Sequence, residues 1–207
     1  MSSPTAPIAP LDEGNLAADP FMQFSLWIEG ARTAGVHEPE AMTLATATRE
    51  GVPSARMVLL RGWGPDGFVF FTNYESRKGT ELDANPVAAL VWHWASIGRQ
   101  VRAEGHVSRT MPAESDAYFA SRHRGSQLGA WASPQSRPIP SRAGLELRVT
   151  EGAERFAGTD VPRPENWGGY RLLPTTFEFW QHADNRLHDR FRYTPDGPAW
   201  RLARLAP

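Results

Sequence analysis

Cysteine is absent from the 207-residue chain, and lysine is nearly absent. Without cysteine the chain can form no disulfide, cysteine-ligated zinc site or iron–sulfur cluster, and it has no cysteine nucleophile. Lys78 is the one lysine among 22 basic residues, so the others are arginines. Arginine is the side chain best shaped to hold a phosphate group through two parallel hydrogen bonds. The positions of the arginines along the chain are therefore the first guide to function.

Long apolar runs and a strong charge excess are also missing. No stretch approaches the ~18 apolar residues of a membrane-spanning helix. The N-terminus has no basic segment followed by an apolar one, and its first basic residue is Arg32, so neither a signal peptide nor a transit peptide is predicted. With 22 basic and 23 acidic residues, the net charge of −1 argues against a nucleic-acid surface. These absences predict a cytoplasmic protein that binds neither membranes nor nucleic acid.

The sequence divides into a short arm and one domain. Residues 1–18 are rich in Pro, Ala and Ser, and we expect a flexible N-terminal arm there. We expect residues 19–207 to form a single domain, beginning with a helix between Asp19-Pro20 and Gly35. The other expected helices cover residues 76–84, 112–121 and 141–156, and the expected strands cover 42–47, 54–61, 68–72, 87–94, 99–109, 176–180, 190–193 and 199–205.

The order of these elements predicts the fold class. About eight short strands are accompanied by helices that do not alternate with them, which favours an α+β fold, predominantly antiparallel β, with a barrel and peripheral helices. The chain contains no GxxxxGK[ST] motif, and its strands do not alternate regularly with helices, so Rossmann and P-loop nucleotide sites are not expected. It also contains no GxSxG motif and no paired-carboxylate signature of hydrolases.

Two groups of residues near helix ends are candidates for binding an anion. Tyr118, Arg122 and Ser126 are spaced four apart, which would align them as a phosphate or carboxylate clamp. The alternative is an ordinary solvent-facing helix end. Arg77 and Lys78 stand in the first turn of a predicted helix, where two cations oppose the helix dipole. A phosphate bound at that helix N-terminus would resolve the conflict.

Arg56 and Arg61 flank an apolar strand. Because they are five residues apart, we expect them on opposite faces of an unbent strand. They need not share a ligand, and charged residues are also common at the ends of buried strands.

The segment 182–190 offers a different kind of candidate. Arg186 and His188 alternate on one side of a predicted extended segment, where they could orient a planar heteroaromatic ring and handle its proton. The spacing of six between His182 and His188 fits no usual pair of metal ligands, so no metal site is predicted. Trp180 could cover a flavin or pyridine ring, or it could belong to the core.

Six motifs follow one another along the chain in a recognisable order: RMVLLRG, FFTNYESRKG, RQVRAEG, YFASRHRGSQLGAWAS, WGGYR and FEFWQHADNRLHDR. The last closely resembles the C-terminal signature of pyridoxamine/pyridoxine 5′-phosphate oxidases, and the others match that family in order. The resemblance extends from about residue 19 to the C-terminus.

The resemblance implies a homodimeric, FMN-binding split β-barrel with two active sites at the subunit interface. The implied reaction of vitamin B6 biosynthesis or salvage transfers hydride from the substrate C4′ to FMN and then to O2. It yields pyridoxal 5′-phosphate and H2O2, with ammonia from the amine substrate. Arg186 and His188 would be catalytic and lie against the pyridine ring. The implied contacts of the substrate phosphate are Arg61, Tyr118, Arg122 and Ser126. The implied FMN contacts are Arg56, Met57, Val58, Leu59, Leu60, Arg61, Phe71, Thr72, Arg77, Lys78, Gln100, Gln135, Ser136, Trp180 and Arg190.

The chain departs from the family pattern in three places. Arg61 stands where the family usually has lysine, and Phe71 replaces a frequent tyrosine. Residues 1–18 do not match the family's basic, tyrosine-containing arm, which suggests a more open substrate site. Two alternatives remain open: a related flavin oxidase of phenazine biosynthesis, whose members tend to lose the substrate-phosphate residues, and a flavin- or pyridoxal-phosphate-binding protein without turnover.

Overall fold

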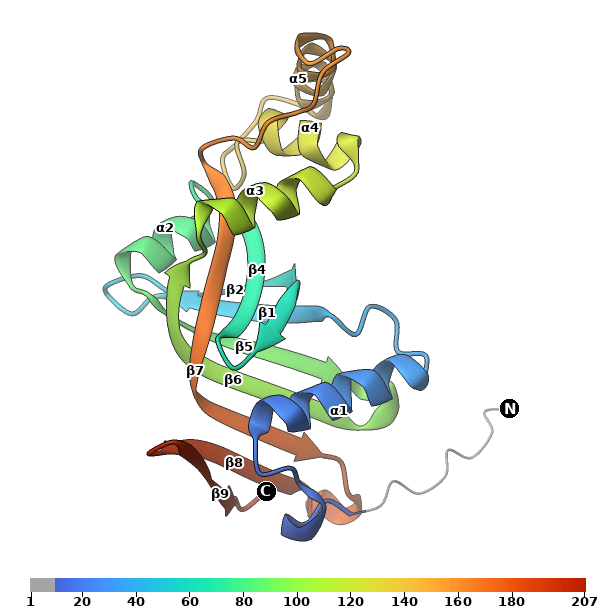
Figure 1. The fold of residues 1–207 in the computed structure, drawn as a ribbon, viewed down its shortest axis with the longest axis vertical. Helices are drawn as coiled ribbons and strands as arrows, with labels where there is room; N and C mark the ends of the chain where they lie inside the picture. Colours follow the sequence, from blue (N-terminus) through green and yellow to red (C-terminus); the bar gives the residue numbers. More distant parts are fainter. Residues whose placement is uncertain (1–9) are drawn as a thin grey trace.

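The structure is a computed structural model, and it describes residues 10–207. Figure 1 shows a curved sheet with helices at its two ends. The helical elements are η1 (Glu13–Asn15), α1 (Pro20–Thr33), α2 (Arg77–Ala84), η2 (Ala95–Ile97), α3 (Pro112–Ser121), α4 (Arg124–Ala132), α5 (Arg142–Arg155) and η3 (Asp184–Arg186). The strands are β1 (Ala41–Ala47), β2 (Pro53–Leu59), β3 (Gly62–Gly64), β4 (Gly67–Asn73), β5 (Val87–Trp94), β6 (Arg99–Arg109), β7 (Trp167–Gln181), β8 (Asp189–Asp196) and β9 (Ala199–Arg204).

All strand pairs in the sheet are antiparallel. The strand order is β2-β1-β5-β6-β7-β4-β3, and β8 pairs with β7 and β9. The predicted α+β class, with helices attached to an antiparallel sheet, is therefore confirmed. None of the helices in residues 10–207 has the length and apolar character needed to cross a membrane.

The main core lies between the sheet and α1. Asp19 caps α1 by accepting a hydrogen bond from the Phe21 N–H at 2.7 Å, and Pro20 occupies the first turn. Phe24 is fully buried and packs edge-to-face against Phe68 at 4.9 Å between ring centroids. Trp27 makes a similar contact with the ring of a core phenylalanine on β7. The helix thus closes one end of the barrel with aromatic side chains, as its apolar spacing predicts.

A second, smaller core holds α3, α4 and α5 at the other end of the molecule (Figure 1). Phe119 of α3, Leu128 of α4, Phe156 and Trp167 are its buried centre. Trp167 begins β7, so this helical cluster is anchored directly to the longest strand of the sheet. The cluster and the strands beneath it enclose the pocket described below.

Residues 10–18 lie against the C-terminal strands, in the second half of the segment predicted as a flexible arm. Leu11 is buried, and its N–H donates to Asp189 at 3.0 Å. Arg204 donates to Glu13 and to Asp189, and the Tyr193 hydroxyl donates to the carbonyl of Ala17 at 2.7 Å. The part of the arm prediction that concerns residues 1–9 lies outside the described residues. For residues 10–18, apolar burial and these hydrogen bonds fix the segment, which its composition did not indicate.

Candidate functional site

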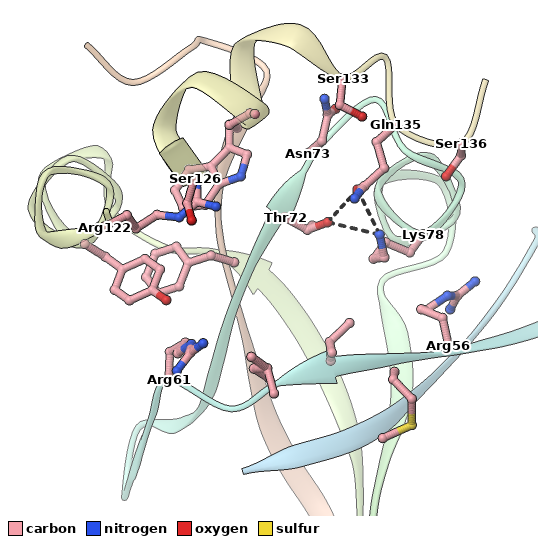
Figure 2. A pocket seen from close by; sticks show the side chains of 18 of the residues that line it. Arg56, Arg61, Thr72, Asn73, Lys78, Arg122, Ser126, Ser133, Gln135 and Ser136 are labelled. Atoms are coloured by element: carbon pink, nitrogen blue, oxygen red, sulfur yellow. Dashed lines mark hydrogen bonds between the residues drawn. The ribbon is translucent and has the colours of Figure 1, made fainter. Parts of the chain in front are cut away.

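A large pocket opens between the sheet and the helical cluster of α3 and α4. Its volume is about 1060 Å³, enough for a cofactor-sized ligand. Figure 2 shows that its side chains come from β2, β4, the start of α2 and the α3–α4 region. It is lined by Ser54–Leu59, Arg61, Phe71–Asn73, Arg77, Lys78, Tyr118, Ser121–His123, Ser126, Gly129, Ala130, Ser133, Gln135, Ser136 and Trp167.

Lys78 is the buried cation of this pocket. Its ammonium donates to Gln135 Oε1 at 3.0 Å, Thr72 Oγ1 at 3.1 Å and Ser76 Oγ at 3.3 Å (Figure 2). None of these partners carries a negative charge. Burial, together with the nearby charge of Arg56, lowers the pKa of Lys78 to about 8. A buried cation held by neutral acceptors is suited to receive an anion.

Backbone geometry brings the N-terminus of α2 close to this lysine. Ser76 caps the helix by accepting a hydrogen bond from the Gly79 N–H. A Cβ atom on Gly79 would lie 2.0 Å from the carbonyl oxygen of Tyr74, so only glycine permits this close turn from β4 into the helix. The tight turn presents Arg77 and Lys78, the first two residues of α2, at the pocket.

Arg56 and Arg77 are joined by a carboxylate behind the pocket wall. Glu81 accepts from Arg77 Nε at 2.9 Å, and its other oxygen lies 3.3 Å from Arg56 Nη2. Burial raises the pKa of Glu81, but hydrogen bonds from Ser54, Thr46 and Arg77, together with the charge of Arg56, outweigh it and leave the pKa at about 2. Glu81 is therefore ionised at neutral pH.

The predicted clamp is present, but it is not built on one helix. Helix α3 ends at Ser121, Arg122 is extended, and Ser126 lies in the first turn of a new helix, α4. The predicted end of the first helix at residue 121 is confirmed, the second helix was not predicted, and Tyr118, Arg122 and Ser126 all line the pocket. The break between the two helices turns Arg122 toward Trp167, whose ring lies 4.7 Å from the guanidinium carbon.

Arg122 has an unused hydrogen-bond donor. Its Nη1 atom is buried and finds no partner among the described residues. Burial lowers the pKa of the Arg122 guanidinium; Tyr118 acts to raise it, and Arg61 to lower it. Tyr118 stacks on Phe71 with ring centroids 4.0 Å apart, which fixes this wall of the pocket. An anionic oxygen is the partner that this donor lacks.

Most residues of the predicted cofactor and substrate set line this pocket. Arg56 and Arg61 both contribute, although we expected them on opposite faces of one strand. Strand β2 ends at Leu59, so Arg61 lies beyond it, and consecutive residues from Ser54 to Leu59 line the pocket, so both faces of this strand contribute to it. Leu60 is an exception, because its side chain is buried in the core. The members at the pocket are Arg56, Met57, Val58, Leu59, Arg61, Phe71, Thr72, Arg77, Lys78, Tyr118, Arg122, Ser126, Gln135 and Ser136.

The remaining predicted residues form a second group, away from the pocket. Gln100 pairs with Trp180, and Trp180 pairs with Arg190, in one row across β6, β7 and β8. The His188 ring lies 4.7 Å from that of Trp180. Arg186 is not on an extended segment as predicted. It is the last residue of the short helix η3 and has a φ of 62°. The prediction that Arg186 and His188 alternate on one side of an extended segment was therefore wrong.

A single chain cannot bring the two groups together. Trp167 lines the pocket, and Trp180 belongs to the second group, yet both lie on β7, 13 positions apart. At the rise of a strand, 13 residues span at most about 43 Å along β7, several times the length of one side chain. Figure 1 shows β7 running from the helical cluster to the opposite end, where β8 lies.

Several residues of this site were not predicted from the sequence. Asn73 and Ser133 line the pocket, and Thr46, Ser54 and Glu81 form the network behind Arg56. The spacing of Arg77 and Glu81, four apart in one predicted helix, was the available signal for that contact. Nowhere in residues 10–207 do three or more His, Cys, Asp or Glu side chains gather in a way that could hold a metal ion.

Curated relatives match almost the whole chain. A protein of Rubrobacter xylanophilus is 56% identical over 199 residues, which cover 96% of this chain and 92% of the relative. A protein of Bordetella pertussis is 57% identical over 198 residues, which cover 95% of this chain and 93% of the relative. Both are named pyridoxine/pyridoxamine 5′-phosphate oxidase. Among solved structures, PhzG from Burkholderia lata, in complex with tetrahydrophenazine-1-carboxylic acid, superposes with a TM-score of 0.90 at 32% identity, covering 97% of this chain and 99% of PhzG.

Two family models match the chain in succession. Residues 28–156 match pyridoxamine 5′-phosphate oxidase, and residues 167–207 match the pyridoxine 5′-phosphate oxidase C-terminal dimerisation region. The first match includes the pocket residues from Ser54 to Ser136, and the second includes Trp167 of the pocket and the separate group from Trp180 to Arg190. The chain therefore belongs to the pyridoxamine 5′-phosphate oxidase family.

Proposed function

We propose that this protein is an FMN-dependent oxidase that converts pyridoxamine 5′-phosphate and pyridoxine 5′-phosphate to pyridoxal 5′-phosphate, with O2 as the electron acceptor. The observation that carries this proposal is that two cations of the pocket, Lys78 and Arg122, have no carboxylate partner among the described residues. Lys78 is held by neutral acceptors, and Arg122 keeps a buried donor without a partner. These are two separate places in one pocket where a phosphate group is suited, as two phosphorylated ligands require.

The chemistry of the donor set fits FMN. Arg56, Arg77 and Lys78 surround the N-terminus of α2, where a phosphate receives backbone as well as side-chain donors. Thr72 and Gln135 provide neutral hydrogen-bonding groups beside them. Polar groups of this kind fix the orientation of a ligand in a pocket of this size. When bound, FMN would supply the acceptor for a hydride from the substrate carbon and the route of its electrons to O2.

The second cationic region would hold the substrate phosphate. Arg61, Tyr118, Arg122 and Ser126 line the pocket on the side of α3 and α4. The guanidinium of Arg61 lies 6.0 Å from the Tyr118 ring, and Tyr118 rests on Phe71, so this region is ordered by aromatic contacts. Arg61 keeps the positive charge where relatives usually have lysine, and it can donate two hydrogen bonds at once.

We further propose a homodimer in which each active site takes residues from both subunits. The 13-position separation along β7 supports this arrangement, because Trp180, Arg186, His188 and Arg190 cannot reach the pocket of their own chain. The name of the matched C-terminal family region, which includes these residues, points the same way. A two-fold axis would place each group against the pocket of the partner, forming two equal sites.

The residues brought by the second subunit would act on the substrate ring. His188 Nδ1 accepts a hydrogen bond from the Ala183 N–H at 3.1 Å, so neutral His188 carries its proton on Nε2. Nε2 can then donate to a substrate heteroatom. Arg186 is exposed on the neighbouring turn and would lie against the ring with its charge. Together the two side chains would position C4′ for hydride transfer.

The alternative within this fold is an oxidase of the phenazine type. The superposition with PhzG supports it, at 32% identity. Relatives named pyridoxine/pyridoxamine 5′-phosphate oxidase are 55–57% identical, and the residues of the substrate-phosphate region are all present. These observations favour the phosphorylated vitamers as substrates. A protein that binds flavin or pyridoxal phosphate without turnover is the second alternative. The cytoplasmic location stays a prediction from the sequence.

One experiment separates the three functions. The purified protein is examined for FMN absorbance and then mixed with pyridoxamine 5′-phosphate or pyridoxine 5′-phosphate under air. We expect bound FMN, formation of the aldehyde and release of H2O2. Bound FMN with no turnover of either substrate would overturn the oxidase proposal, and turnover of tetrahydrophenazine-1-carboxylic acid in their place would support the alternative.

A further inference from the structure

Glu81 is a buried carboxylate behind the pocket, and it is not among the residues that line it. It is 5% exposed, and within residues 10–207 only Glu178 is a similarly buried acidic residue. We propose that Glu81 is a positioning residue, which holds Arg56 and Arg77 in the orientation that binds the phosphate of the cofactor. This inference rests on the proposed function, because it concerns the FMN region of the same pocket.

The contacts of Glu81 connect two elements that approach the pocket from different sides. Oε1 accepts from Arg77, one turn earlier in α2, at 2.9 Å. Oε2 lies 3.3 Å from Arg56 Nη2 on β2 and also accepts from the hydroxyls of Thr46 and Ser54. Both oxygens are therefore occupied by donors. Glu81 is placed to orient arginines and not to accept a proton from a ligand.

The two arginines depend on this carboxylate to different degrees. Arg56 also donates to Thr46 Oγ1 at 2.6 Å and to the Leu44 carbonyl at 3.1 Å. Among the described residues, the guanidinium of Arg77 donates a single hydrogen bond, to Glu81, and its side chain is 58% exposed. Without Glu81 the long side chain of Arg77 would be free to move in solvent. Arg77 is thus the residue through which the loss of Glu81 should act most strongly.

The charges near α2 also match a phosphate group. Arg56, Arg77 and Lys78 carry three positive charges and Glu81 one negative charge, which leaves two. A phosphate monoester carries about −1.5 to −2 at neutral pH, so bound phosphate would nearly neutralise the cluster. Glu81 contacts both arginines, while the hydrogen bonds of Lys78 go to neutral groups. The full charge of the lysine thus stays available to the ligand.

A positioning role and a simple charge effect predict opposite results. If Glu81 acted only through its negative charge, its removal would strengthen the binding of an anion. If it holds the arginines in place, its removal weakens that binding. Glu81→Gln removes the charge at nearly constant shape, and Glu81→Asp keeps the charge but shortens the side chain. The pair separates charge from position.

The test compares the affinities of flavin-free protein for FMN and riboflavin, measured by quenching of flavin fluorescence. Riboflavin lacks the phosphate, so it reports on the rest of the pocket. We expect both Glu81 variants to bind FMN about tenfold more weakly than the wild type, which corresponds to the loss of one hydrogen bond to a charged group. Their affinity for riboflavin should equal that of the wild type. Asp83→Asn is the matched control, because Asp83 lies on the same helix, accepts from Arg109 at 2.7 Å and does not line the pocket. It should change neither affinity.

A double-mutant cycle with Arg77→Ala tests the route of the effect. The single variant Arg77→Ala should also weaken FMN selectively, and adding Glu81→Gln to it should have a much smaller effect than in the wild type. If Glu81→Gln does not fold, Glu81→Asp and Arg77→Ala decide the question. Wild-type affinity for FMN in the Glu81 variants, tighter binding, or an equal loss of riboflavin would overturn the inference. A wild-type protein that binds neither flavin would refute the proposed function, and the inference with it.

Discussion

The titration of Lys78 gives a quantitative test of the buried cation in the pocket. Burial, with repulsion from Arg56, lowers its pKa from 10.5 to about 8. A decrease of this size corresponds to about 3 kcal/mol, by which the charged lysine destabilises the folded chain relative to the neutral form. Lys78→Met removes the charge while keeping an unbranched side chain, so it removes this cost.

The sign of the pH dependence follows from the two pKa values. Below about pH 8, Lys78 is protonated in both states, and the whole cost is present. Between about pH 8 and 10.5 the unfolded chain binds more protons than the folded chain, so the free energy of unfolding rises with pH. Between pH 7 and pH 10, the free energy of unfolding of the flavin-free wild-type protein should therefore rise by about 2–3 kcal/mol relative to that of Lys78→Met.

Urea denaturation of the two flavin-free proteins at pH 7, 8, 9 and 10 measures this gain. Lys78→Arg is the control, because a guanidinium stays charged over this range and its stability should run parallel to that of Lys78→Met. FMN affinity should also fall above pH 8 in the wild type, by up to about tenfold per pH unit, and not in Lys78→Arg. A constant difference between wild type and Lys78→Met at all four pH values would refute the argument.

Three further predictions concern the two halves of the site and the turn into α2. Arg122→Ala should raise the KM for the phosphorylated substrate about 10- to 100-fold with little change in kcat, because it removes a charged hydrogen-bond donor; equal losses in both constants would contradict this role. Arg186→Ala should lower kcat about 100-fold while FMN absorbance is retained, and loss of the flavin would contradict it. Gly79→Ala should destabilise the protein by about 2–3 kcal/mol in urea denaturation, because the new Cβ would collide with the carbonyl of Tyr74. Gly125→Ala, in a helix with open space around it, should not destabilise and is the matched control.

Local signals predicted the elements whose ends are marked by capping residues. Asp19-Pro20 places the start of α1 correctly, and Ser76 does the same for α2. The class of the fold also followed from the sequence, because short alternating runs separated by turns predict an antiparallel sheet. The presence of Arg56 and Arg61 at one pocket could not be predicted from strand alternation, since β2 ends at Leu59 and Arg61 lies beyond it.

Tertiary contacts determine the structural features that could not be predicted from the sequence. The first half of β7 contains Gly168, Gly169 and Pro174, which weaken any strand prediction, yet its pairing with β4 and β6 makes it extended. A Cβ on Gly169 would lie 2.5 Å from the Thr110 hydroxyl, so the glycine permits close packing there. The positive φ of Arg186 could not be inferred from composition, because non-glycine residues rarely adopt it.

Mixing two impaired variants tests most directly whether the active site is shared between two chains. Arg122→Ala impairs the pocket and Arg186→Ala the second group, and at a substrate concentration far below KM each alone should retain about a tenth of wild-type activity or less. When equal amounts are unfolded and refolded together, half of the dimers contain one copy of each, and one of their two sites is intact. We predict recovery of about a quarter of wild-type activity in the mixture. No recovery, with mixed dimers demonstrated, would contradict a site built from both subunits.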